Sequence, residues 1–165
     1  MKRLIATFMV SSALVSLPAQ ASPELAAMWG DSAASLEQQT AEMITAIDLG
    51  GRNDVSEDYI LGVSRFGRTS GGLAKWNDAS GGPHDLGCIF RGMATESEDQ
   101  TLALIDTDDA VDARGHLERL EAMFSDAQLI AKAAIVQSPT PSLLNKHKSE
   151  ACPMELEAAR RALQN

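Results

Sequence analysis

Six side chains near the Gly-Gly-Pro break at 81–83 have types and spacing that could do chemistry. Four are basic, one is aromatic and one is acidic: Arg65, Arg68, Trp76, His84, Asp85 and Arg91. Such basic groups bind an anion or a carboxylate when several of them converge. The sequence therefore predicts a ligand-binding site formed by Arg65, Arg68, Trp76, His84 and Arg91. The competing interpretation is that these groups form ordinary salt bridges to acidic residues on neighbouring helices.

Catalytic and metal-binding patterns are missing from the sequence. The three histidines, at 84, 116 and 147, lie far apart, and neither E-x-x-H nor H-E-x-x-H occurs. There is also no G-x-S-x-G elbow and no phosphate-binding loop. We therefore predict no catalytic residues and no metal site, and a binding function is favoured over an enzymatic one.

Haem needs separate consideration because helical bundles often bind it. The covalent C-x-x-C-H attachment motif is absent, which excludes the c-type class. A non-covalent haem held by Met28 or Met43 together with His147 stays open as an alternative. Methionines at helical spacing are more often core residues, so no cofactor is predicted.

The first 21 residues have the pattern of a secretory signal peptide. A basic start precedes an apolar run at positions 4–17, and an Ala-Gln-Ala cleavage site follows it just before Ser22. The run of about 14 residues is shorter than the roughly 20 that a transmembrane helix needs. We expect residues 1–21 to be removed, and residues 22–165 to form a single helical domain without a membrane span, located in the periplasm or secreted.

Acidic residues outnumber basic ones, and the formal net charge is −9. Loss of Lys2 and Arg3 with the signal peptide would leave 12 basic against 23 acidic residues, a net charge of −11. Such a charge repels phosphate backbones and anionic lipid headgroups. We therefore expect no nucleic-acid binding, and the partner is predicted to be an unidentified protein or small ligand.

The two cysteines are Cys88 and Cys152. In an oxidising compartment, an even number of cysteines is most simply explained by pairing. A Cys88–Cys152 disulfide would close a loop of about 65 residues and stabilise the fold by about 4 kcal/mol in the chain-entropy model. A redox-active or metal-binding pair is the alternative, although the sequence has no C-x-x-C.

The first helix is predicted from Pro23 to the Gly50-Gly51 stop, with Gly30 as a point where it could be interrupted. Its expected inward face is spaced by three, four and seven residues: Leu25, Met28, Ser32, Leu36, Met43 and Ile47. Trp29 lies beside this face and is expected to pack in the core.

Residues 56–78 allow two interpretations. Ser56 is a plausible N-cap for a helix with one apolar face: Tyr59, Val63, Phe66, Ser70 and Leu73. Four glycines in the same stretch each disfavour a helix by about 1 kcal/mol relative to alanine. The second interpretation is a pair of short strands at 59–66 and 73–76, joined by a turn at 68–72.

Two further long helices are predicted after the Gly-Gly-Pro break. The first carries Leu86, Ile89, Phe90, Met93 and Leu104, and could be broken near 95–99. The second is predicted to be capped by Thr107, and its inward residues follow a regular pattern: Ala110, Ala113, Leu117, Leu120, Phe124, Ala127, Ala131 and Ala134. Pro139 and Pro141 end it, and a short helix is expected from Cys152.

The predicted fold is all-α: an up-down four-helix bundle with a short C-terminal helix that the disulfide pins to the bundle. These expectations favour a non-enzymatic exported helical-bundle protein that works as a periplasmic binding or interaction module. A haem- or small-ligand-binding bundle is the alternative.

Overall fold

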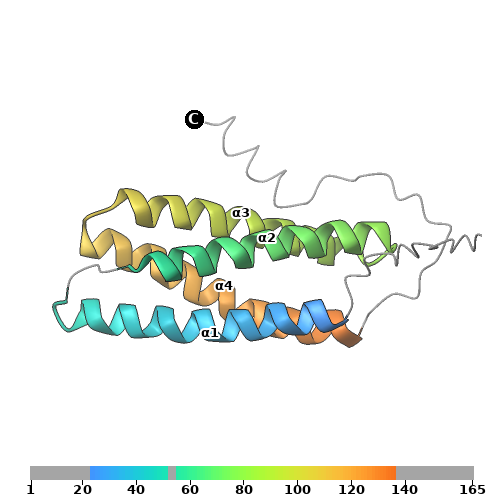
Figure 1. The fold of residues 1–165 in the computed structure, drawn as a ribbon, viewed down its shortest axis with the longest axis horizontal. Helices are drawn as coiled ribbons and strands as arrows, with labels where there is room; N and C mark the ends of the chain where they lie inside the picture. The colour runs from blue at the N-terminus through green and yellow to red at the C-terminus, as the bar shows by residue number, and fades with distance from the viewer. Residues whose placement is uncertain (1–22, 52–54, 137–165) are drawn as a thin grey trace, which may run out of the picture.

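The computed structural model describes residues 23–51 and 55–136, and this part of the chain forms four helices and no strand. The helices are α1 (Pro23–Asp48), α2 (Glu57–Ala79), α3 (His84–Asp106) and α4 (Ala110–Val136). They run alternately up and down, with short connections (Figure 1). The predicted all-helical bundle is therefore confirmed for these residues. The expected signal peptide and the expected helix from Cys152 lie outside the described residues.

Glycine turns end the first two helices in the same way. Gly50 and Gly81 have φ angles of 83° and 70°, in the left-handed region that favours glycine. The amide of the next residue then donates back into the helix: Gly51 N to Ala46 O at 2.9 Å, and Gly82 N to Asn77 O at 2.8 Å. Both turns are Schellman motifs, which satisfy carbonyl groups that a helix end leaves open. The predicted Gly50-Gly51 stop is confirmed.

The uncertainty over residues 56–78 is resolved in favour of the helix. Ser56 Oγ accepts a hydrogen bond from the Tyr59 amide at 3.2 Å, as predicted for an N-cap. The strand-pair interpretation is wrong, because all of 57–79 is helical. Tertiary packing compensates for the low helix propensity of the glycines, since Phe66, Leu73 and their neighbours bury one whole face of α2.

Two other boundaries differ from those predicted. The third helix is continuous through 95–99, where Ser97 Oγ turns inward and donates to Met93 O at 2.6 Å. Asp109, rather than Thr107, caps the fourth helix: its Oδ1 accepts from the amides of Val111 and Asp112 at 2.7 and 3.1 Å. A carboxylate at this position also interacts favourably with the positive end of the helix dipole.

The predicted inward face of α1 is partly confirmed: Leu36 is buried, and Leu25, Met43 and Ile47 pack against the core. Trp29 is 1% exposed and lies in the core as expected, but Met28 is 67% exposed, so its predicted place on the inward face is wrong. The buried residues of α1 are mainly small: Ala26, Trp29, Gly30, Ala33, Leu36 and Thr40. A Cβ added to Gly30 would lie only 2.7 Å from Ala131 Cβ, so this glycine permits the close approach of α1 and α4.

The centre of the bundle is an aromatic cluster with one ring from each helix. Trp29 stacks on Phe66 at a centroid distance of 5.0 Å and meets the edge of Phe90 at 5.3 Å. Phe66 also meets Phe124 edge to face at 5.1 Å. The indole N–H donates to Ser70 Oγ at 2.8 Å, so the polar atom of the buried tryptophan is satisfied.

Two polar contacts fix the end of the bundle near the α1–α2 connection. The Tyr59 hydroxyl lies 2.7 Å from Thr40 Oγ1, which itself donates to Leu36 O. Burial raises the pKa of Tyr59 to about 12, so the phenol stays neutral at physiological pH. Arg114 on α4 donates to Asp48 on α1 at 2.7 Å, and this hydrogen bond lowers the pKa of the Asp48 carboxyl.

Packing divides the four helices into two close pairs. α1 makes its most extensive contacts with α4, and α2 makes its most extensive contacts with α3. Within the described residues, no helix has an apolar stretch long enough to span a membrane. Residues of α2 and α3 also line a groove on the outer side of this pair.

Candidate functional site

A groove of about 740 Å³ lies along α2 and α3. Its volume is within the range of about 300–1,000 Å³ that is typical of ligand pockets. Fourteen residues from the two helices line it: Ile60, Ser64, Gly67, Arg68, Gly71, Gly72, Lys75, Ala94, Thr95, Ser97, Glu98, Thr101, Leu102 and Ile105. Two helices of one close pair therefore supply all of its walls.

Small residues make the floor of the groove. At Gly67 an added Cβ would lie 2.8 Å from Ser97 Cβ, so this glycine permits the close approach of α2 and α3. A Cβ added to Gly71 would make only an ordinary contact, with Ala94 Cβ at 4.0 Å, and a Cβ added to Gly72 would have no atom within 4 Å. Close helix packing thus explains why residue 67 is a glycine. It does not explain the glycine at position 72, which faces open space.

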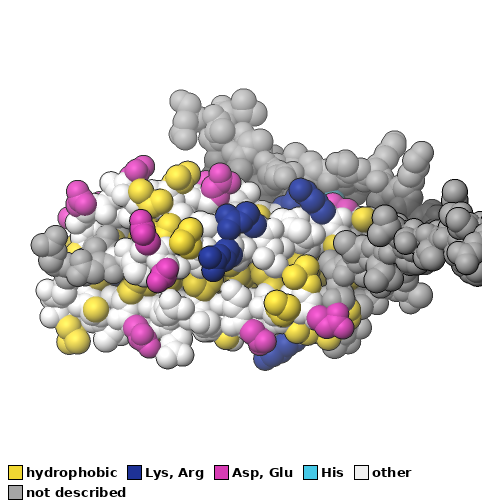
Figure 2. Space-filling view, in the orientation of Figure 1, with side chains coloured by type: hydrophobic (Ala, Val, Ile, Leu, Met, Phe, Trp, Pro, Cys, Tyr) yellow, Lys and Arg dark blue, Asp and Glu magenta, His cyan; other side chains and the backbone are white. Residues whose placement is uncertain are grey.

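The cations of α2 give the groove its charge. Arg65, Arg68 and Lys75 are exposed and form no ion pair within the described part of the chain. No Asp or Glu occurs between Tyr59 and Asn77 on this helix. Lys and Arg side chains gather near the middle of the face that Figure 2 shows, with hydrophobic side chains beside them. Glu98 is the acidic residue in the lining, on α3.

Thr101 adds a buried polar atom to the wall formed by α3. The residue is 7% exposed, and its Oγ1 has no hydrogen-bond partner among the described residues. Buried hydroxyl groups nearly always have a partner, and leaving one without costs about 1–3 kcal/mol. The hydroxyl of Ser97, one turn away, is satisfied by Met93 O. Thr101 is therefore an unsatisfied hydrogen-bonding group beside the groove.

The structure separates the five residues predicted to form one site. Arg68 lines the groove, and Arg65 is exposed three residues earlier on α2. Trp76, His84 and Arg91 are half-buried near the connection between α2 and α3, outside the groove lining. Spacing in the sequence suggested one cluster, but the two helices distribute these residues between the groove and the turn.

At the turn, polar contacts hold the ends of α2 and α3 together. Arg91 NH1 donates to Asp78 Oδ2 at 2.7 Å, the salt bridge that the competing interpretation predicts. Asn77 Nδ2 donates to Pro83 O at 2.8 Å and closes the connection. Asp85 is exposed in the first turn of α3, where a carboxylate suits the helix dipole. In this part of the predicted cluster, Arg91 joins the ends of α2 and α3 instead of lining the groove.

Cys88 lies on the same part of α3 and is 7% exposed. Its Sγ is 3.5 Å from His84 Nε2 and 3.6 Å from an Arg91 guanidinium nitrogen. Cys152, its predicted partner, lies outside the described residues, so the disulfide stays a prediction. His84 is thus placed against a sulfur atom rather than in the groove.

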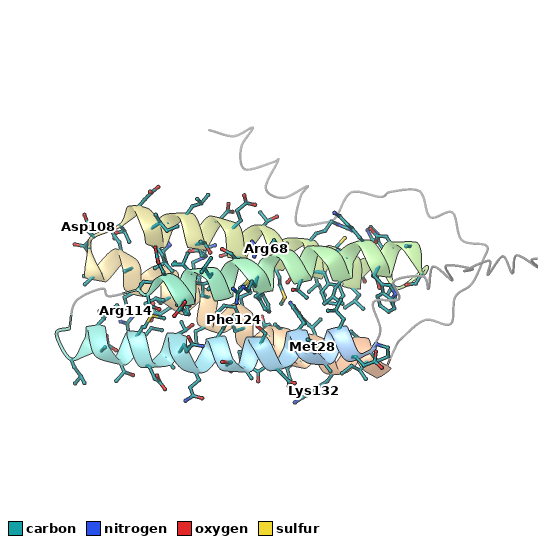
Figure 3. All side chains as sticks on the ribbon, in the orientation of Figure 1. Met28, Arg68, Asp108, Arg114, Phe124 and Lys132 are labelled. Carbon is teal, nitrogen blue, oxygen red and sulfur yellow. The ribbon has the colours of Figure 1, made fainter. Side chains whose placement is uncertain are left out.

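Metal and haem ligands are not assembled in the part of the chain described by the structure. Within residues 23–51 and 55–136, no group of three or more His, Cys, Asp or Glu side chains could hold a metal ion. Met28 is exposed on the outer side of α1, as Figure 3 shows, and Met43 is only partly buried. His147 lies outside the described residues, and the haem alternative stays a prediction.

Lys75 and Thr101 line the groove but were not among the predicted site residues. Lys75 was overlooked, although the acid-free stretch from Tyr59 to Asn77 carries three cations in an acidic chain and could have revealed it. Thr101 left no signal in the sequence, because its missing partner depends on the packing of α3. No protein family model, no curated protein and no solved structure matches this chain.

Proposed function

We propose that this chain is an exported, non-enzymatic helical bundle that works by binding, and that its α2–α3 groove takes a ligand with negative charge. The observation that carries the proposal is the lack of ion-pair partners for Arg65, Arg68 and Lys75 among the described residues. An anionic ligand would supply the opposite charge that these side chains lack.

The contrast with the other arginines of the described helices supports this role. Arg91, Arg114 and Arg119 all pair with Asp or Glu at 3.0 Å or less. Acidic side chains are therefore available throughout the bundle, but none occupies the middle of α2. The arrangement leaves positive charge beside a groove of ligand size, in a protein whose net charge is negative. An arginine in such a position binds carboxylate or phosphate groups well.

Export and the disulfide belong to the same proposal and have their own test. We expect the mature protein, purified after expression with its first 21 residues, to begin at Ser22, because the cleavage site precedes it. Cys88 and Cys152 should resist alkylation until a reductant is added, since a disulfide holds both thiols. Intact-mass spectrometry with and without reduction measures both features. A mature chain that begins at Met1, or thiols that react at once, would contradict this part.

Binding to the groove is tested with a pair of dyes that differ in charge. We expect fluorescein, which is anionic, to bind the folded protein at one saturable site, and a cationic rhodamine ester of similar shape not to bind. Changing Arg68 and Lys75 together to Gln should weaken fluorescein binding about tenfold or more, because each removes a charge worth up to about 1 kcal/mol. Fluorescence polarisation at low salt measures the affinity.

Lys132 provides the matched control. It is exposed on α4, away from the groove, and it also lacks an ion pair among the residues described (Figure 3). Lys132→Gln removes one positive charge away from the groove, half of the charge that the double variant removes, and should leave fluorescein binding unchanged. If the Lys132 variant loses half as much binding free energy as the double variant, net charge rather than the groove determines binding, and the proposal is wrong.

A further inference from the structure

We infer that the ligand of the α2–α3 groove is an amphiphile with one alkyl chain and an anionic head group. The inference rests on the proposed function and adds the chemical class of the ligand. It comes from the way apolar and charged residues are separated along the groove. Because α2 and α3 are antiparallel neighbours, each end of the groove combines one part of α2 with the facing part of α3.

One end of the groove is apolar and open to solvent. Ile60 from α2 faces this end together with Leu102 and Ile105 from α3. Leu102 and Ile105 are 55% and 59% exposed, which is unfavourable for side chains of this size when they are adjacent. An alkyl chain lying over them would remove this surface from water.

The other end carries the two cations of the groove lining, Arg68 and Lys75. Arg68 and Lys75 are seven residues apart, about two helical turns, so they lie on the same side of α2. Gly71 and Gly72 lie between them, and each glycine makes the helix about 1 kcal/mol less stable than alanine would. Close packing does not require Gly72, which faces open space. The two glycines leave room for a head group between two positive charges.

Thr101 lies one helical turn of α3 beyond Ser97, which faces Gly67, and is therefore next to the apolar end of the groove. Its Oγ1 is buried, so the alkyl chain rather than the head group would pass over this residue. The distance along α2 from Arg68 to Ile60 is about 12 Å, which sets the length available to the chain.

The first experiment varies the length of the alkyl chain with a constant head group. Isothermal titration calorimetry of the full chain with hexanoate, octanoate, decanoate and dodecanoate, below micelle-forming concentrations, should show one site. Affinity should rise about two- to fourfold per added methylene group and then level off when the chain reaches Ile60 and Ile105. Acetate carries the charge without the chain and should not bind measurably.

The second experiment varies the head group with a constant chain. Decanoate and decyl phosphate should both bind, whereas decanol and decyltrimethylammonium should bind at least tenfold more weakly. Tighter binding of decyl phosphate would identify a phosphate head of the phospholipid type, and tighter binding of decanoate would identify a fatty acid. Equal binding of the neutral, cationic and anionic compounds would overturn the inference.

Three variants assign the site to the groove. Arg68→Gln should weaken decanoate binding about tenfold, whereas Thr101→Val should leave the affinity within about twofold of the unchanged protein, because its hydroxyl is buried and does not face the head group. Gly72→Leu should abolish binding because its side chain occupies the groove, while the circular dichroism spectrum stays helical. Lys132→Gln is again the control and should bind decanoate normally. Unchanged affinity in the Arg68 and Gly72 variants would place the alkyl chain elsewhere and overturn the inference.

The two proposals fail in different ways. If fluorescein binding depends on Arg68 and Lys75 but carboxylate affinity does not increase with chain length, the groove binds anions and the amphiphile inference alone is wrong. If neither fluorescein nor decanoate responds to Arg68→Gln, both proposals are wrong.

Discussion

Trp29→Ala is expected to lower the free energy of unfolding by about 3–5 kcal/mol, the range for removing a large aromatic side chain from a core. The indole is 1% exposed and contacts the rings of Phe66 and Phe90. Its removal leaves a cavity at the centre of all four helices and takes the hydrogen-bond donor away from Ser70 Oγ. Chemical denaturation followed by circular dichroism measures the loss.

The second tryptophan of the chain supplies the control for this prediction. Trp76 is half-buried near the end of α2, and no ring contact involves it within the described residues. Trp76→Ala should therefore lower the free energy of unfolding by about 1 kcal/mol or less. Equal decreases in the free energy of unfolding for the two variants would show that the aromatic cluster around Trp29 does not stabilise the bundle more than an ordinary half-buried side chain does.

The helices differ in how well the sequence predicts their inward faces. In α4, seven of the expected residues are buried, from Ala113 to Ala134, because large and small apolar residues recur there between charged ones. In α1, half of the core residues are alanine or glycine, which give a weak hydrophobic signal. Met28 is strongly apolar in the sequence but exposed in the structure. The hydrophobicity of single residues therefore predicts the inward face of α1 less well than that of α4.

The candidate site was only partly predictable for a related reason. Arg68 was identified from its charge, but its grouping with Trp76, His84 and Arg91 assumed that residues near one break in the chain lie together. The groove instead depends on which residues of α3 face Gly67 and Gly71, and this register follows from packing. A local feature such as a cap or a Schellman turn is encoded in a few adjacent residues, whereas a groove between helices is not.

The same substitution is expected to change the free energy of unfolding in opposite directions at two glycines of α2. Gly67→Leu should lower the free energy of unfolding by about 2–3 kcal/mol, because its Cβ would lie 2.8 Å from Ser97 Cβ and the helices would have to separate. Gly72→Leu should raise the free energy of unfolding by about 0.5–1 kcal/mol, since helix propensity improves and nothing is displaced. Denaturant unfolding of both variants measures the difference.

The pair is informative because the two substitutions are chemically identical and five residues apart on one helix. Helix propensity favours leucine at both positions, so the difference in sign can come only from the neighbours on α3. If both variants lost stability, Gly72 would be a packing residue like Gly67, and the open floor between Arg68 and Lys75 would not exist. A stabilised Gly72→Leu variant that no longer binds decanoate would mean that this glycine is kept at the expense of stability, as expected for a position that serves a ligand.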